Sequence, residues 1–161
     1  MTTTETGTSD SDRFLVSRDT RQMAHSLADP PSRRLVALSR EECLTLLGSV
    51  PVGQVVFTHH ALPEVLPVNF RLDGDAVMIR VAIGSVLAHA AEGAVLAFHA
   101  DRIDAATRTG WSVTVVGRAT EITDAAERQR VADLPLETWV GDGRDHFVCI
   151  PAERITGRRL V

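Results

Sequence analysis

Three residues near the middle of the chain have the types and the spacing of an anion site. Arg80 lies within an apolar run, and Gly84 and Ser85 follow it four and five residues later. A Gly-Ser pair at the start of a helix offers backbone N–H groups and a hydroxyl, and arginine adds a fork of donors suited to phosphate oxygens. The spacing alone leaves two interpretations open: a phosphate site, or an edge-strand arginine in solvent before an ordinary helix start.

A second group of residues could contact a flat heterocycle. Pro67 and Asn69 lie in a β-rich run, where they fit poorly with plain core packing. The backbone there could present its amides and carbonyls to a ring, although a bulge at a sheet edge explains the residues equally well. Trp111 begins a later β-rich run and is either a stacking wall or a residue at the rim of a barrel.

Several other chemistries lack their motifs. The histidines, including the adjacent His59 and His60, show no zinc-ligand spacing. There is no G-x-S-x-G elbow and no G-x-G-x-x-G fingerprint. Cys43 and Cys149 are far apart and are expected to be reduced thiols. The sequence therefore predicts no metal site and identifies no catalytic residue.

The composition excludes two classes of partner. A net charge of −4 argues against broad contact with nucleic acid, which basic surfaces bind. No apolar stretch approaches the roughly 18 residues of a membrane span. The N-terminus is acidic and rich in hydroxyls, unlike a secretory signal, so we expect a cytoplasmic protein.

The elements that must position these residues are mostly strands. Residues 1–32 are polar and aperiodic and are expected to form a flexible tail before a single domain over residues 33–161. Ser39 and Glu42 form a capping box that predicts a helix over Arg40–Leu47. Further helices are predicted over Gly84–Glu92 and from the cap Asp124 to about Ala132.

Between the helices, the periodicity predicts strands at Gln54–His59, Val65–Leu72, Ala76–Ala82, Ala94–Ala100, Trp111–Ile122, His146–Ile150 and Arg154–Val161. Turns are expected at Ala61–Pro63 and Asp73–Gly74, a loop at Asp101–Gly110, and a bulge or crossing point at Gly117. Such closely spaced strands favour a mainly β (α+β) fold, an antiparallel barrel with short helices, over a doubly wound sheet.

In this order, four stretches resemble the pyridoxamine 5′-phosphate oxidase-like family of flavin-binding split barrels, near its small nitroimidazole-reductase-like bacterial members. They are LSREECLTLLGSVPVGQVVF, LPVNFRLDGDAVMIRVAIGS, AVLAFHADRIDAATRTGWSVTVVGRATEITD and DHFVCIPAERITGRRL. Together they cover about residues 35 to 160, and their agreement in order is more specific than any single motif.

The resemblance implies a six-stranded antiparallel split β-barrel and a homodimer with FMN at its interface. Backbone atoms of the PVNF strand would line the flavin ring, and the IRVAIGSV segment would hold the phosphate. The start of the Trp111 strand, together with Trp139 from the second subunit, would border the ring. The implied cofactor-binding residues are Pro67, Val68, Asn69, Arg80, Val81, Ala82, Gly84, Ser85, Val86, Trp111, Ser112 and Trp139. Members commonly carry a phosphate-binding lysine where this chain has Val86.

The resemblance implies an FMN-dependent oxidoreductase that acts on a small molecule, with the flavin supplying the electron transfer. Two alternatives stay open. One is a non-catalytic carrier or sensor that binds flavin or haem, and the other is a reductase that uses the deazaflavin F420. The substrate is not encoded in these motifs, because the loops of such barrels determine specificity.

Overall fold

The structure is a computed structural model that describes residues 34–82, 84–90, 93–135 and 146–161. The predicted tail over residues 1–32 lies outside these residues, so the tail and its boundary stay predictions. Twelve elements follow one another: β1 (Leu35–Ala37), α1 (Arg40–Leu47), β2 (Val52–His59), β3 (Leu62–Asp73), β4 (Ala76–Val81), α2 (Val86–Ala90), β5 (Val95–Asp104), β6 (Thr109–Arg118), β7 (Thr120–Glu121), α3 (Ala125–Ala132), β8 (His146–Pro151) and β9 (Arg154–Leu160).

All pairings between neighbouring strands are antiparallel, and the nine strands lie in the order β1-β9-β6-β5-β2-β3-β4-β8-β7. The predicted mainly β class is confirmed, but the strand count differs from six. The difference is partly one of bending, because only Ala119 separates β6 from β7, and only Ala152 and Glu153 separate β8 from β9. With each of these pairs counted as one bent strand, six long strands remain, and β1 adds a short edge that the sequence pattern did not indicate.

Because the chain bends between β6 and β7, one continuous segment pairs with two different strands. β6 pairs with β9, whereas β7, directly after it in the chain, pairs with β8. Gly117 lies at this bend, and a Cβ at its position would collide with the carbonyl oxygen of Pro151. The predicted crossing point at Gly117 is therefore confirmed, because only a residue without a side chain lets the two strands approach so closely.

The helix α1 has the bounds that its capping box predicted from the sequence. The Ser39 hydroxyl accepts a hydrogen bond from the backbone N–H of Glu42, and the Glu42 carboxylate accepts one from the backbone N–H of Ser39. The hydrogen bond from the Ser39 backbone N–H, followed by the contribution of the Ser39 side chain, lowers the pKa of the Glu42 carboxyl. The helix spans Arg40–Leu47 as predicted, and Cys43 and Leu47 are its buried residues.

Two predicted connections are wrong in detail. The β2–β3 turn lies at His60 and Ala61, which both have positive φ, rather than at Ala61–Pro63. The predicted loop Asp101–Gly110 is mostly strand, because β5 and β6 stay paired as far as Asp104↔Thr109. Residues 101–104 are all exposed, so the apolar alternation that revealed the rest of β5 stops before the strand does.

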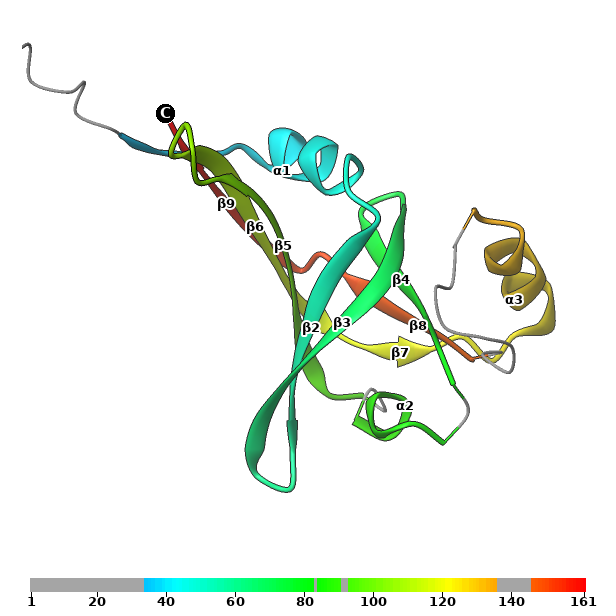
Figure 1. Cartoon of the computed structure of the whole chain (residues 1–161). Coiled ribbons are helices and arrows are strands. Elements are labelled where there is room, and N and C mark those ends of the chain that lie inside the picture. The colour runs from blue at the N-terminus through cyan, green and yellow to red at the C-terminus, as the bar shows by residue number, and fades with distance from the viewer. Residues whose placement is uncertain (1–33, 83, 91–92, 136–145) are drawn as a thin grey trace, which may run out of the picture. The chain divides into compact units, whose positions relative to one another are not determined.

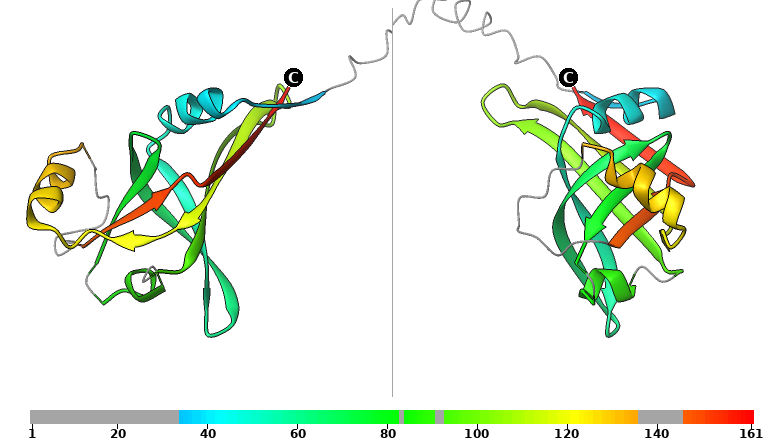
Figure 2. Two further views of the ribbon diagram at one scale, coloured as in Figure 1. Left: turned by 180° about the vertical axis from the view of Figure 1, so that it is seen from behind. Right: turned by 90° about the vertical axis from the view of Figure 1, so that its right-hand side faces the viewer.

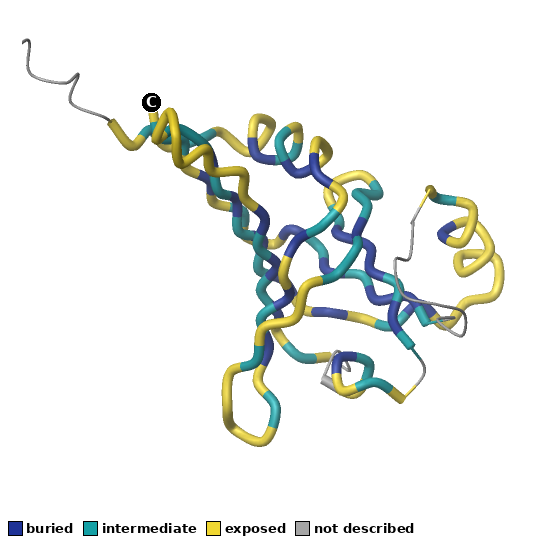
Figure 3. The backbone as a smooth tube through the Cα atoms, in the orientation of Figure 1, coloured by how far each residue is buried: buried dark blue, intermediate teal, exposed yellow. Residues whose placement is uncertain are grey.

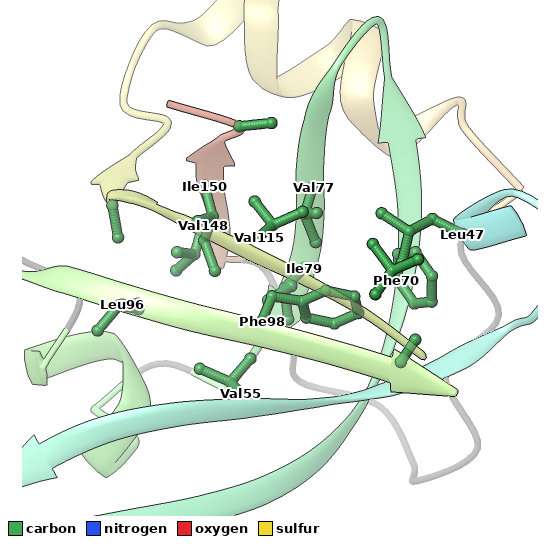
Figure 4. Close-up of a cluster of buried hydrophobic side chains, with 14 of the residues drawn as sticks. Leu47, Val55, Phe70, Val77, Ile79, Leu96, Phe98, Val115, Val148 and Ile150 are labelled. Atoms are coloured by element: carbon green, nitrogen blue, oxygen red, sulfur yellow. The ribbon is translucent and has the colours of Figure 1, made fainter. Parts of the chain in front are cut away.

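Two apolar clusters hold the domain together. The main cluster lies between the strands and contains Val55, Phe70, Ile79, Phe98 and Ile150 (Figure 4). A smaller cluster of Met78, Ile122, Val131 and Phe147 lies on the other face of β4 and β8, under α3.

Figures 1 and 2 show α3 outside β8, and Figure 3 shows that most of the helix is exposed. Successive β4 side chains alternate between the two clusters. Arg80, two residues after Met78, therefore lies on the α3 side of the strand.

Candidate functional site

The candidate site lies where β3 and β4 separate. In the described chain, their ladder runs only from Phe70↔Ile79 to Asp73↔Ala76. Beyond Phe70, β3 pairs with β2, and beyond Ile79, β4 pairs with β8. The two strands therefore diverge, and a pocket of about 330 Å³ lies in the split. It is lined by Leu66, Pro67, Val68, Arg80, Val81, Ala82, Ser85 and Leu87.

Half of the predicted cofactor-binding residues meet in this pocket. Two of them come from β3, three from β4 and the residue after it, and one from the start of α2; they are Pro67, Val68, Arg80, Val81, Ala82 and Ser85. Two further lining residues, Leu66 and Leu87, were not predicted. Leu66 adjoins the PVNF motif and Leu87 faces inward on the predicted helix, so adjacency and helical spacing were the signals that could have found them.

Gly84 and Ser85 shape the α2 end of the pocket. Gly84 has a φ of +70°, a left-handed conformation that glycine adopts without strain. The Ser85 hydroxyl accepts a hydrogen bond from the backbone N–H of Ala88 at 3.2 Å, which caps the first turn of α2. The Ser85 hydroxyl keeps its own proton for donation. The helix begins at Val86 rather than Gly84, and Leu87 fixes it to the main cluster at 3% exposure.

The other predicted residues lie outside the pocket lining. Asn69 is half-buried and pairs with Val52 of β2, while Gly84 and Val86 are exposed. The Trp111 side chain is 8% exposed and belongs to the main cluster. Ser112 lines a different pocket, together with Thr114, Thr156, Gly157 and Arg158. Trp139 lies outside the described residues.

Sheet register explains why Ser112 is remote from the split. Pro67, Gln54, His99 and Thr114 are successive partners across β3, β2, β5 and β6. Neighbouring strands lie about 4.8 Å apart, so this row places β6 roughly 14 Å from β3. Within one protomer, Ser112 and Pro67 therefore belong to different sites on the sheet.

Arg80 also borders a second pocket, of about 300 Å³, on the α3 side of β4. Its lining consists of Arg80, Ala125, Arg128, Gln129, Ala132 and Phe147. The guanidinium carbon of Arg80 lies 5.7 Å from the centroid of the Phe147 ring, its cross-strand partner. The four α3 residues follow the i, i+3, i+4, i+7 spacing of one helix face. Sequence reasoning missed this pocket, because nothing in the α3 sequence indicates that this face meets β4.

The two thiols are poor nucleophiles. Burial raises the pKa of Cys43 and of Cys149, so both are protonated near neutral pH. Among the residues with described placement, no group of three or more His, Cys, Asp and Glu side chains could hold a metal ion. His146 and Glu121 lie close together on neighbouring strands, with 2.6 Å between Nδ1 and Oε1.

No helix in the described part of the chain is long and apolar enough to cross a membrane.

Comparisons with known proteins agree with this architecture. A family model described as pyridoxamine 5′-phosphate oxidase matches residues 39–159. The uncharacterized protein Rv0080 of Mycobacterium tuberculosis is 41% identical over an alignment of 140 residues that covers 83% of this chain and 91% of that protein.

Solved structures show the same fold. The FAD binding protein from Mycobacterium smegmatis is 34% identical, with a TM-score of 0.66 over 76% of this chain and 95% of that one. An FAD-binding protein from Mesorhizobium loti, 22% identical, has a TM-score of 0.64 over 80% of this chain and 98% of that one, a likeness of fold alone. The family match spans most of the domain, including both strands of the split, and this chain belongs to the pyridoxamine 5′-phosphate oxidase family.

Proposed function

We propose that this protein is a flavin-binding oxidoreductase that acts on a small molecule and holds the FMN portion of its cofactor in the split between β3 and β4. The observation that carries the proposal is the meeting of Pro67 and Val68 with Arg80, Ala82 and Ser85 around one pocket. The 34% identical Mycobacterium smegmatis protein is described as an FAD binding protein, which supports a flavin rather than haem or F420.

The chemistry of the lining fits a flat ring whose side chain carries a phosphate. Leu66, Val68 and Leu87 supply aliphatic surface for a flat apolar heterocycle. Arg80 and Ser85 supply a guanidinium fork and a hydroxyl donor at the β4–α2 side, and both groups suit phosphate oxygens. The pocket thus offers both charge-binding donors and aliphatic surface, as a ligand with one charged end and one flat end requires.

The protein residues would bind and orient the cofactor rather than transfer protons. When bound, a flavin supplies the electron-transfer chemistry. Arg80 is the one ionisable side chain among the described residues that line the pocket, and a guanidinium offers hydrogen-bond donors but no acceptor. Pro67 has no backbone N–H, so its position on β3 presents a carbonyl and a rigid ring instead of a donor. The aliphatic wall would exclude water from one face of the ring.

A homodimer would complete the site. Trp111 and Ser112 were predicted to border the ring, and β6 lies three strands from β3 within one protomer. A second copy could supply its own β6 to the split of the first. Exposed apolar residues on β3 and β5 support such a contact: Leu62, Val65, Leu66 and Val95 are between 37% and 67% exposed. Sedimentation should find a dimer at micromolar concentration, and a stable monomer that retains the cofactor would contradict this.

The first experiment identifies the cofactor itself. The small molecule released on denaturing the purified protein should have the mass and the visible spectrum of a flavin. A haem or F420 spectrum would replace this proposal with one of the two alternatives predicted from the sequence. The cytoplasmic location predicted from the sequence is a separate expectation, which fractionation of cells would test.

A variant then tests the site. Arg80→Ala should weaken FMN by about tenfold to a hundredfold, because a charge-assisted hydrogen bond contributes about 1.5–3 kcal/mol. Riboflavin, which has no phosphate, should bind the wild type and the variant equally. Arg102→Ala is the matched control, because Arg102 is exposed on β5 and lies outside the pocket lining. Equal weakening of FMN and riboflavin would show that Arg80 does not contact the phosphate.

A further inference from the structure

Arg80 is shared by two pockets, and the second pocket has the lining of an anion subsite. Beside Arg80 it contains Arg128 and the carboxamide of Gln129, and its remaining lining residues are Ala125, Ala132 and Phe147. None of these described residues is a carboxylate, so the described part of the lining carries two positive charges and no negative one. Guanidinium groups match the geometry of phosphate oxygens and can bind them through two parallel hydrogen bonds.

The shape of the α3 face leaves room for a ligand along the helix. Ala125 and Ala132 stand one turn before and one turn after the Arg128–Gln129 pair, and their short side chains keep both ends of the pocket open. Val131 is fully buried in the small cluster under α3, so it fixes the helix to the sheet. The Arg128 face is thereby held at a defined place beside β4.

The position of Arg80 determines what can reach this pocket. In the proposed flavin site, the phosphate of the FMN portion lies at Arg80, at the boundary of the two pockets. A group attached beyond that phosphate could extend from Arg80 along the second pocket. Each pocket alone, at about 300 Å³ and about 330 Å³, is at the lower limit for a small-molecule site. Together they suit a longer ligand that is charged at its middle.

We infer that the preferred cofactor is the dinucleotide FAD rather than FMN, with its second phosphate at Arg128 and its adenosine along the Ala125–Ala132 face of α3. This inference rests on the proposed flavin site. Arg80 would contact the phosphate that FMN and FAD share, whereas Arg128 would contact only the phosphate that FAD adds. Arg128 is thus a specificity residue for the cofactor.

Equilibrium titration of FAD, FMN and riboflavin into apo-protein tests the inference. Wild type should bind FAD at least about tenfold more tightly than FMN, because FAD adds a charge-assisted contact. Arg128→Ala should remove most of that preference and leave FMN affinity unchanged. Arg130→Ala is the matched control, because it removes the same charge from the same helix. Arg130 lies two residues further on and pairs with Asp73 at 2.7 Å, outside the lining of the pocket.

The outcomes separate the two proposals. Equal affinity of wild type for FAD and FMN, or an FAD preference that survives Arg128→Ala, overturns the inference and leaves the flavin site in place. Failure of wild type to bind any of the three flavins overturns both. Circular dichroism and the melting temperature of each variant establish that it is folded. If Arg128→Ala is misfolded, Arg128→Gln, which keeps the length and polarity of the side chain, replaces it in the same titration.

Discussion

The β5–β6 region and the β3–β4 region are both antiparallel hairpins, but they have different uses. The β5–β6 ladder holds ten residue pairs, from Val95↔Arg118 to Asp104↔Thr109, whereas the β3–β4 ladder holds four. A complete ladder satisfies the backbone groups within the sheet and directs alternate side chains into the core. Where the ladder ends early, strand edges and side chains line a pocket instead. Completeness of pairing therefore separates the part of this barrel that supplies stability from the part proposed to bind the cofactor.

Pro67 lies in the part of β3 that diverges from β4. A proline cannot donate a ladder hydrogen bond, so it is tolerated where a strand has lost one neighbour. Among the described strands, β3 pairs at Pro67 with β2 alone, since its pairing with β4 begins at Phe70. The residue that fits least well in an uninterrupted sheet thus lies where the sheet opens.

Removal of a large side chain from each region should give the largest contrast. Phe98 is fully buried on β5 and packs against Phe70 with 4.5 Å between ring centroids. Phe98→Ala should lower the free energy of unfolding by about 3–5 kcal/mol. Leu66→Ala, in the pocket lining and at 37% exposure, should cost about 1 kcal/mol or less. Denaturant unfolding measures both, and similar losses would break the distinction between the two regions.

Closure of the barrel should be the next most sensitive feature. Gly117→Ala would place a methyl group against the Pro151 carbonyl oxygen, so we expect a loss of about 2–3 kcal/mol as the strands move apart. Gly48→Ala is the control, because its added Cβ would have no neighbour closer than 3.6 Å and its φ is −62°. The same unfolding assay applies, and a change at Gly117 no greater than that at Gly48 would refute the close crossing.

A lysine at position 86 should change binding without changing stability. Val86 is 40% exposed, so the ammonium group of Val86→Lys stays in water and the melting temperature should change little. Its charge near Ser85 should tighten FMN by up to about tenfold and leave riboflavin unchanged. Fluorescence titration of both ligands measures this. Equal tightening of both would indicate a contact with the ring instead of the phosphate.

The smallest effect should come from acid at the β5–β6 turn. The Asp104 carboxylate accepts hydrogen bonds from the backbone N–H groups of Thr107 at 3.1 Å and Ala106 at 2.8 Å. Its pKa is lowered first by the backbone and side chain of Thr107 and then by the backbone of Ala106. A lowered pKa in the folded state stabilises the protein above the unfolded value, near pH 4, and this stabilisation is lost as the pH falls further. The difference in melting temperature between wild type and Asp104→Ala should therefore be small at neutral pH and shrink below about pH 4. A difference that grows in acid would contradict the assignment.

Signals that act over a few residues were predictable from the sequence. The capping pair Ser39 and Glu42 located α1, Asp124 located the start of α3, and Gly117 marked a crossing point. These features are local because a cap, a helical turn or a missing Cβ is set by neighbours in the chain. The grouping of Pro67 and Val68 with Arg80 was also expected, but through the resemblance of ordered motifs rather than through local physics.

Long-range pairing decided the rest. Arg80 meets Phe147 only because β4 pairs with β8, and the α3 face that holds Arg128 reaches Arg80 only because Val131 packs on that same pair of strands. Trp111 has a buried side chain and Ser112 an outward one because alternation along β6 directs neighbours to opposite faces. The length of each ladder was not predictable from the sequence either. Exposed pairs such as Asp104↔Thr109 bury no apolar surface, so they leave no apolar alternation in the sequence. The sequence by itself determined most of the strands, the caps and the residues suited to a phosphate. Their assembly into two adjoining pockets depends on register between distant segments, which no local pattern encodes.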